Sequence, residues 1–177
     1  MNLRQATIDE VPKIWKILQQ AIERRRLDGS QQWQNGYPNE QSIHQDLSLG
    51  NAYVLVEDDE ILAYAAIIFD KEPAYEVLDT WLTKGDYVVI HRVATSDRAK
   101  GKGLATKLFE LIENLAVSEG VFSIKVDTNF DNAPMLRIMD KLGYTYCGEV
   151  YFHGSARKAF EKSLKVGFLA DEKIATQ

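Results

Sequence analysis

The sequence predicts a single α/β domain, in which a central mixed sheet carries helices on both faces. The chain has 177 residues, of which 45% are hydrophobic, enough for one sizeable core. Apolar segments of strand character alternate with segments of helical period along the chain. One strand–helix–strand run, residues 87–127, implies a parallel, right-handed connection. We expect this domain to span residues 1–165, and residues 166–177 to form a C-terminal extension, either a short helix or a tail.

The first predicted elements are a short strand and a helix. Residues 3–7 form the strand, and Asp9 is a good N-cap that puts Pro12 in the first helical turn. The helix fades at residues 24–26, three arginines whose charge complements the helix dipole. Its apolar residues recur at helical spacing: Val11, Ile14, Trp15, Leu18, Ala21 and Ile22.

A polar segment separates this helix from a second one. Residues 28–38 contain two glycines and a proline, which predicts a loop. Its aromatic residues, Trp33 and Tyr37, either pack back onto the core or line a pocket. A second helix fits residues 40–49 and ends at Gly50.

Two strands and an irregular excursion come next. Residues 52–57 and 61–69 predict strands joined by an acidic turn, and the second is apolar on both faces, so we expect it in the centre of the sheet. Residues 70–85 have no clean period. Such an excursion either shapes a substrate pocket or covers a sheet edge. It contains Glu72, Tyr75, Glu76 and Trp81.

The rest of the chain predicts two helices and four strands. Residues 87–95 form a strand, and the helix after it has a wide apolar face that suits packing on the sheet. Residues 122–127 return to the sheet, and Asp131 or Asn132 caps a further helix that ends at Gly143. Residues 144–152 and 157–164 then predict a closing pair of strands.

Composition and charge narrow the classes of function. The net charge is −5 and the pI about 5.3, which argues against a nucleic-acid binder. Cys147 is the only cysteine, so an intrachain disulfide and a multi-cysteine metal site are excluded, and we expect a packed thiol and no bound metal. The first ten residues do not resemble a signal peptide, and the longest apolar run, residues 62–69, is too short to span a bilayer. We therefore expect a cytoplasmic protein with no membrane partner.

A glycine-spaced basic segment follows the strand of residues 87–95. Five Arg or Lys residues and a single acid, Asp97, lie between His91 and Lys107. Glycines let a backbone approach an anion closely, and the start of a helix offers free N–H groups. Basic side chains beside such N–H groups add a second attraction for phosphate. The sequence therefore predicts that residues 98–105, called here the glycine turn, hold the pyrophosphate of a coenzyme.

Three nucleotide-binding patterns can be compared with the glycine turn. The P-loop pattern G-x-x-x-x-G-K-[ST] does not occur in the chain. The dinucleotide pattern G-x-G-x-x-G/A, which would indicate a nicotinamide-binding enzyme, fits poorly because its third small position is Thr106. The third comparison fits. Arg98-Ala99-Lys100-Gly101-Lys102-Gly103 resembles the R/Q-x-x-G-x-G/A signature of the GNAT N-acetyltransferase superfamily.

The resemblance to this superfamily covers residues 3–164. It includes the strand ending at Asp127-Thr128-Asn129, the helix from Asn132, and Lys141-Leu142-Gly143-Tyr144. It implies a GNAT-like acyl-CoA N-acyltransferase fold with acetyl-CoA as co-substrate and no metal. It also implies that a primary amine attacks the acetyl group directly in a ternary complex. The acceptor is a small amine or a protein amino group, and a homodimer is one assembly that the resemblance allows.

The resemblance also implies which residues hold the coenzyme. Backbone N–H groups of residues 100–105 should cradle the pyrophosphate. The strand at residues 91–93 should pair with the pantetheine arm and supply an N–H to the thioester carbonyl. Asn132 matches a position that often hydrogen-bonds the coenzyme. The expected set is His91, Val93, Arg98, Ala99, Lys100, Gly101, Lys102, Gly103, Leu104, Ala105 and Asn132.

His91 is the best candidate for the catalytic base. Histidine titrates near neutral pH, and strand alternation puts His91 on the same face as Tyr87 and Val89, which in the family borders the substrate. The alternative is a histidine packed between helix and sheet. Glu76 and Glu149 are weaker candidates for the base.

The general acid is less clearly marked in the sequence. The family often uses a tyrosine just before the K-x-G-[FY] element, where this chain has Met139. We take Tyr144 as the substitute catalytic residue, with Tyr146, Tyr151 or water as alternatives. Met139 also motivates a second hypothesis, that the chain is a CoA-binding sensor or interaction module without chemistry.

Overall fold

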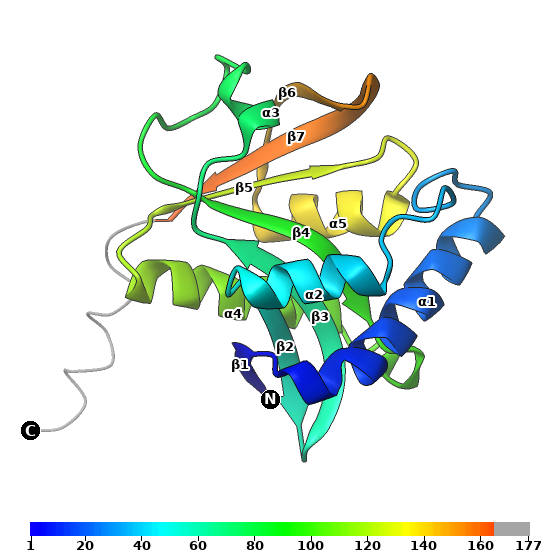
Figure 1. The fold of residues 1–177 in the computed structure, drawn as a ribbon. Helices are drawn as coiled ribbons and strands as arrows, with labels where there is room; N and C mark the ends of the chain where they lie inside the picture. Colours follow the sequence, from blue (N-terminus) through cyan, green and yellow to red (C-terminus); the bar gives the residue numbers. More distant parts are fainter. Residues whose placement is uncertain (165–177) are drawn as a thin grey trace, which may run out of the picture.

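The computed structural model describes residues 1–164, which form a seven-stranded sheet with helices on both faces (Figure 1). The strand order is β1-β2-β3-β4-β5-β7-β6, and β4 and β5 are the parallel pair in an otherwise antiparallel sheet. The strands are β1 Asn2–Gln5, β2 Ala52–Glu57, β3 Glu60–Ile68, β4 Val88–Thr95, β5 Ser123–Thr128, β6 Thr145–Phe152 and β7 Ser155–Ser163. The predicted C-terminal extension, residues 166–177, lies outside the described residues.

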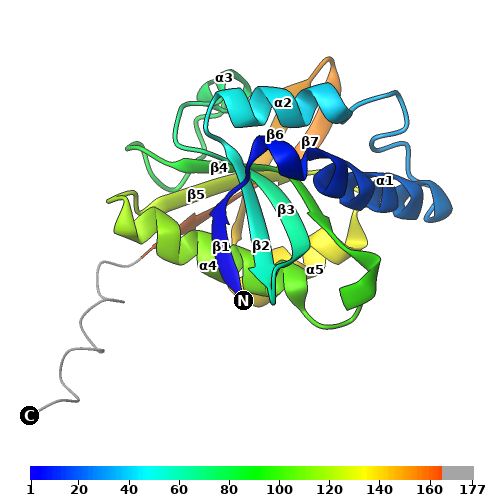
Figure 2. The ribbon, with the colours of Figure 1, turned by 60° about the horizontal axis from the view of Figure 1, so that its bottom comes forward.

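The helices divide between the two faces of the sheet. They are α1 Val11–Leu27, α2 Glu40–Ser48, α3 Pro73–Glu76, α4 Leu104–Ser118 and α5 Ala133–Leu142, with 3₁₀ turns at Ile8–Glu10 and Asp97–Ala99. Figure 2 shows α1 and α2 on one face and α4 and α5 on the other. Separate apolar cores lie under the two layers, and β3 is buried along nearly its whole length. The predicted mixed sheet with helices on both faces, and the central place of β3, are confirmed.

The start of the first helix differs from the prediction. The Asp9 N-cap is wrong, because Thr7 caps a 3₁₀ turn that leads directly into α1. The Glu10 carboxylate accepts the Thr7 N–H at 2.9 Å, so this Thr-x-x-Glu pair, rather than Asp9, fixes where the helical segment begins. Pro12 still falls in the first turn of α1.

The Glu10 carboxylate gives the fold a pH dependence. Arg4 donates hydrogen bonds of 2.6 and 3.0 Å to it, and these lower the pKa of Glu10 from 4.5 to about 2. A carboxyl whose pKa is lowered in the folded state contributes stability above its unfolded pKa and loses it as the pH falls through its folded pKa. Glu10→Gln should therefore lower the free energy of unfolding by about 1 kcal/mol at pH 7. The difference from wild type should vanish between pH 4.5 and about 2. Urea unfolding at stepped pH measures it, and a constant difference would contradict this account.

A bulge in β4 shapes the centre of the molecule. The β3–β4 register shifts at this point, and Arg92 adopts a left-handed conformation with φ of 54°. Consequently His91 and Arg92 both face the layer of α2 and α3, while Val93 packs against the core under α4 and α5. The β4–β5 pairing stops at Ile90, and Figure 1 shows the two strands diverging beyond it. The edge of β4 that faces β5 is therefore open from His91 onward.

A buried ion pair holds the bulge to α2. Arg92 donates to Asp46 at 2.8 and 2.5 Å, and it also donates to the Tyr37 hydroxyl. Asp46 is 3% exposed and accepts a further hydrogen bond from Tyr64 at 2.5 Å. The pair ties α2 and the loop of residues 28–38 to β4.

Breaking this pair should be costly. Asp46→Ala should lower the free energy of unfolding by about 3–5 kcal/mol, because it leaves the Arg92 charge buried without its partner. Urea unfolding at pH 7 measures the loss. Glu60→Ala removes the exposed partner of Arg98 and is the matched control, for which we expect a much smaller change. Equal losses in the two variants would refute the role given to Asp46.

Candidate active site

A groove lies along the open edge of β4. It has a volume of about 170 Å³, and its walls are β4 residues 93–95, Ala105 of α4, and Asn132, Met135 and Ile138 of α5. The C-terminal end of α1 and residues 32–33 border it from the other layer. The groove, named here the β4–α5 groove, thus combines apolar walls with an unpaired strand edge. It suits an elongated ligand that carries amide groups along an apolar arm.

The glycine turn offers a row of free backbone donors at one end of this groove. Gly101 and Gly103 have φ of 79° and 68°, in the left-handed region that favours glycine, and the space beside both is open. The first hydrogen bond of α4 runs from the N–H of Lys107 to Gly103. Within residues 1–164 no acceptor contacts the N–H groups of residues 101 and 103–106. Five neighbouring N–H groups at a helix start form a site for an anion.

The side chains around the glycine turn leave it positively charged. Lys100 and Lys102 are exposed and have no carboxylate within 4.0 Å in the described part of the chain. Asp97 is neutralised by Arg24, while Arg98 pairs with Glu60 at 2.6 Å. The side chains of two other expected residues are buried, so only their backbone is available to a ligand. These two are Ala99 and Leu104.

Asn132 lies at the other wall of the β4–α5 groove. Its side chain caps α5 by accepting the N–H of Met135 at 3.3 Å. Its amide also donates to Gln32 at 3.2 Å, which joins α5 to the loop of residues 28–38 across the groove. The sequence placed Asn132 correctly at a helix start. No local sequence pattern marked Gln32 as a groove residue, because its partner Asn132 is a hundred residues away along the chain.

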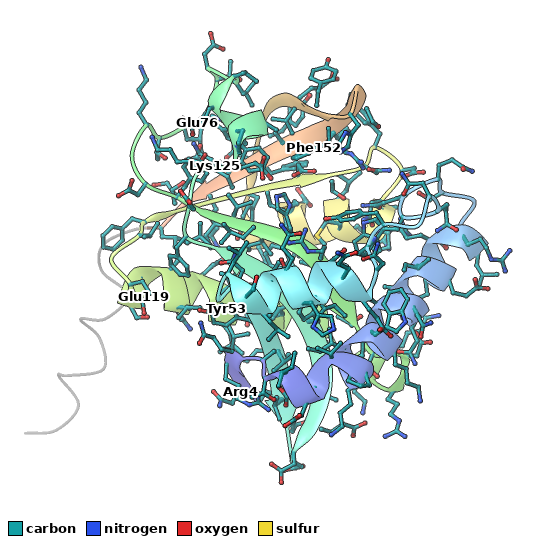
Figure 3. The ribbon with its side chains drawn as sticks, viewed as in Figure 1. Arg4, Tyr53, Glu76, Glu119, Lys125 and Phe152 are labelled. Carbon is teal, nitrogen blue, oxygen red and sulfur yellow. The ribbon has the colours of Figure 1, made fainter. Side chains whose placement is uncertain are left out.

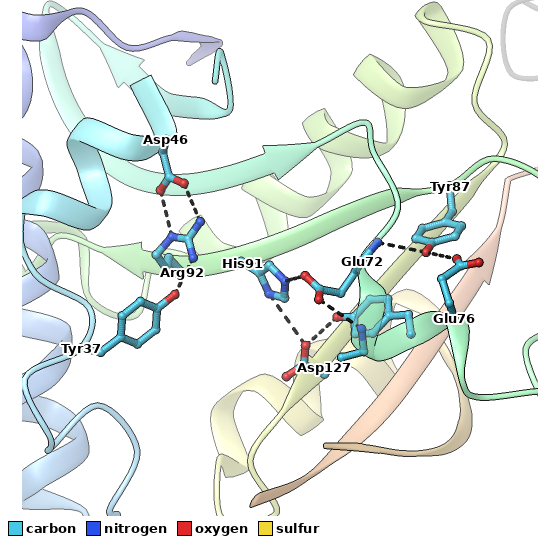
Figure 4. Close-up of polar contacts among 10 residues, drawn as sticks. Tyr37, Asp46, Glu72, Glu76, Tyr87, His91, Arg92 and Asp127 are labelled. Atoms are coloured by element: carbon cyan, nitrogen blue, oxygen red, sulfur yellow. Dashed lines mark hydrogen bonds and ion pairs between the residues drawn. The ribbon is translucent and has the colours of Figure 1, made fainter. Parts of the chain in front are cut away.

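Four side chains gather where β4 and β5 separate, and we call them the His91 cluster: Glu72, Tyr75, His91 and Asp127. His91 Nε2 lies 3.3 Å from Glu72 Oε2, and His91 Nδ1 lies 3.8 Å from Asp127 Oδ1 (Figure 4). Tyr75 donates its hydroxyl to the same Asp127 oxygen at 2.5 Å. The face of β4 is the one expected, since Tyr87 and Val89 pack with Tyr75 on that side. The histidine therefore has one carboxylate near each ring nitrogen.

The environment sets the protonation of this cluster. The hydrogen bond from His91 lowers the pKa of Glu72, so Glu72 is a carboxylate at neutral pH. Burial, together with the charge of Asp127, raises the pKa of Tyr75, so its hydroxyl remains a donor. His91, Glu72 and Asp127 keep 17%, 21% and 11% of their side-chain surface exposed. A partly exposed histidine held between carboxylates can accept a proton and pass it on.

Tyr144 lies apart from this cluster, and its burial argues against the expected role as proton donor to the departing thiolate. It is 6% exposed and packs edge-on against Phe109 of α4, with ring centroids 5.9 Å apart. Gly143 adopts a left-handed conformation, and the chain then turns into β6. The Tyr144 side chain, which follows this turn, lies in the core under α4. His91 faces the opposite layer. Met139, at the position of the family's usual tyrosine, is fully buried in the same core.

The other candidates for acid and base lie elsewhere. Glu76 accepts the Tyr87 hydroxyl at 2.6 Å, and Glu149 accepts the hydroxyl of the exposed Tyr151 at 3.1 Å. Neither carboxylate contacts His91. Sequence reasoning missed Glu72 and Tyr75 as partners of His91, because the apolar residues of segment 70–85 follow neither a helical nor a strand period.

Comparison with known proteins places this architecture among the acetyltransferases. The chain belongs to the Acetyltransferase (GNAT) family, whose sequence model matches residues 15–144. A GNAT-family acetyltransferase from Streptococcus agalactiae is 33% identical, with a TM-score of 0.83 over 93% of this chain and 95% of that one. An acetyltransferase from Salmonella typhimurium, solved with its cofactor acetyl-CoA, shares the fold at 17% identity and a TM-score of 0.64, over 93% of this chain and 94% of that one.

A curated relative is similar over part of its length. Streptothricin acetyltransferase from Escherichia coli is 30% identical over 93 residues, which is 51% of this chain and 51% of that protein. The match thus spans about half of this relative.

The predicted family and fold are therefore confirmed, and acetyl-CoA is the coenzyme that this family uses. Within residues 1–164, no three His, Cys, Asp or Glu side chains gather as a metal site requires. No helix in that part of the chain has the length and apolar character needed to cross a membrane.

Proposed function

We propose that this chain is an acetyl-CoA-dependent N-acetyltransferase, in which a primary amine attacks the acetyl group directly while both substrates are bound. The observation that carries the proposal is His91, held between two carboxylates where β4 and β5 separate, two residues before the segment of β4 that lines the β4–α5 groove. Membership of the GNAT family supports the same reaction.

The residues of the groove fit acetyl-CoA. The free N–H groups of residues 101 and 103–106, with Lys100 and Lys102, suit its pyrophosphate. The open edge of β4 suits the amides of its pantetheine arm, with Val93 and Asn132 on the walls. When bound, acetyl-CoA supplies the acetyl group as a thioester. The backbone at the Arg92 bulge is the candidate donor to the thioester carbonyl, as the family resemblance implied.

The protein's own groups then handle the protons. His91 takes the proton that the amine must lose. Glu72, the more exposed of the two carboxylates, then passes that proton from His91 to solvent. Asp127 and Tyr75 hold the imidazole ring in place. Because Tyr144 is in the core, the proton for the departing sulfur comes from water or from one of the exposed tyrosines, Tyr146 and Tyr151.

The acceptor is best sought among cationic amines. Glu72 and Asp127 place two acidic side chains beside His91, which favours a positively charged substrate. The partial similarity to streptothricin acetyltransferase makes streptothricin the first acceptor to test.

Release of the CoA thiol tests this function. Streptothricin, spermidine, lysine and a lysine-containing peptide are each incubated with protein and acetyl-CoA. We expect turnover of at least one, with intersecting double-reciprocal plots that indicate a ternary complex. If the protein binds acetyl-CoA but acetylates none of these amines, the non-catalytic CoA-binding module motivated by Met139 is the better description.

A further inference from the structure

A second pocket, of about 220 Å³, lies beneath the excursion of residues 70–85. It is lined by α3, the segment after it, and Lys125 of β5, and it shares no lining residue with the β4–α5 groove. Figure 3 labels Lys125 and Glu76 in this region, where α3 lies near β5. The aromatic side chains that line it are Tyr75, Trp81 and Tyr87. Tyr75 also belongs to the His91 cluster, whereas the other lining residues have no part in the proposed acetyl transfer.

Lys125 is the buried charge of this pocket. The residue is 3% exposed, and its Nζ lies 4.0 Å from the ring centroid of Tyr87 and 4.6 Å from that of Trp81. Burial lowers the pKa of Lys125, while the two ring faces stabilise its ammonium. An aromatic face offers no lone pair to an N–H. Within residues 1–164 no carboxylate lies within 4.0 Å of this ammonium, and no hydrogen-bond acceptor contacts it.

The carboxylates nearest to Lys125 accept hydrogen bonds from other donors. Glu161 stands opposite Lys125 in the β5–β7 register and is fully buried. Its oxygens accept from Leu82 N–H, Thr83 hydroxyl and Ser123 hydroxyl. Glu76 accepts the Tyr87 hydroxyl. The charge of Lys125 is thus balanced at a distance, while the three N–H donors of its ammonium remain free. The Lys125 Nζ keeps some accessible surface, so its free donors can be reached by an acceptor from outside the chain.

The lining of the pocket defines the chemistry of that acceptor. Three lysines (71, 84 and 125) and two acids (Glu76 and Asp79) line it, and Glu161 lies opposite Lys125. The free N–H donors of Lys125, rather than a net charge, therefore favour an anionic acceptor, and a carboxylate is the organic group that pairs best with a desolvated ammonium. The aromatic walls favour an apolar, planar body behind it. We propose that this pocket binds the carboxylate of a small aromatic acid, with Lys125 as the anion-binding residue.

Indole signals in NMR spectra test the proposal. The chain has three tryptophans, so a ¹⁵N correlation spectrum shows three indole signals, and Trp81→Phe identifies the one in the pocket. Trp81 Nε1 donates to the Tyr75 carbonyl at 2.8 Å, which makes it sensitive to a ligand there. Titration with benzoate and phenylacetate, without acetyl-CoA, should shift the Trp81 signal and leave that of Trp15 unchanged. Benzyl alcohol, which lacks the charge, should bind at least about tenfold more weakly than benzoate.

Two variants assign the effect to Lys125. Lys125→Met keeps the apolar stem and should weaken benzoate binding at least about tenfold. It should lower the thermal stability, because it removes the cation opposite the buried Glu161, so binding is compared at a temperature at which both proteins are folded. Lys71→Met, at the exposed rim, is the matched control and should bind benzoate within about twofold of wild type.

The proposal is overturned if neither acid moves the Trp81 signal of the wild-type protein at millimolar concentration, a result that requires no variant to fold. It is also overturned if Lys125→Met binds benzoate as wild type does. Since acetyl-CoA is absent throughout, these results stand independently of the acetyltransferase function.

Discussion

His91→Gln should lower kcat for amine acetylation by roughly 100-fold or more, because it removes the group that takes the proton from the amine. The side chain lies between Glu72 and Asp127, and glutamine keeps its approximate size while losing its basicity. Steady-state thiol release on the best acceptor of the panel measures the loss. The deficit should shrink as the pH rises, because more of the amine is then already free of its proton.

Two comparisons separate this role from simple packing. His44→Gln changes an exposed histidine of α2 and should leave kcat unchanged. The affinity of His91→Gln for acetyl-CoA should stay near that of wild type, since the coenzyme is expected to contact β4 through its backbone. A kcat within threefold of wild type would mean that His91 is a packed histidine and that another group acts as the base.

Gly103→Glu should weaken acetyl-CoA binding by about 100-fold or more. Gly103 precedes α4 with φ of 68°, and a side chain there would occupy the open space beside the turn. Its carboxylate would also repel the pyrophosphate and occupy the donors that should bind it. Calorimetric titration with acetyl-CoA measures the change.

The matched control for this variant is Gly120→Glu. Gly120 has φ of 77° and open space beside it, like Gly103, but it follows the far end of α4. The strain of a left-handed glutamate is therefore common to both variants, and only Gly103→Glu should lose the coenzyme. Undiminished binding in Gly103→Glu would remove the glycine turn from the coenzyme site.

Much of the fold follows from local patterns in the sequence. The period of two in β4 gave the correct face for His91, and the apolar stripes of α4 gave its packing on the sheet. Glycines marked the turn at residues 101–103 because left-handed backbone there favours them. These features depend on residues close together in the chain, which is where periodicity and turn chemistry carry information.

The features that define the site depend on distant residues. Arg92 has a left-handed conformation without being glycine, and its long-range partner Asp46 holds it there, so no local pattern marks the bulge. Glu72 reaches His91 from the N-cap of a four-residue helix inside an aperiodic segment. Tyr144 is the last residue of a recognisable motif, yet the direction of its side chain is set by core packing against Phe109. The sequence therefore marked the conformation of the glycine turn better than it marked the residues that contact His91.

A crystal structure of the protein with CoA bound tests the central claim most directly. We expect the pyrophosphate at the N–H groups of residues 101 and 103–106, and the pantetheine arm along the open edge of β4. The sulfur should then lie beside His91, on the side of β4 that Glu72 and Asp127 share. A sulfur that lies away from His91, or a coenzyme bound outside the β4–α5 groove, would contradict the account.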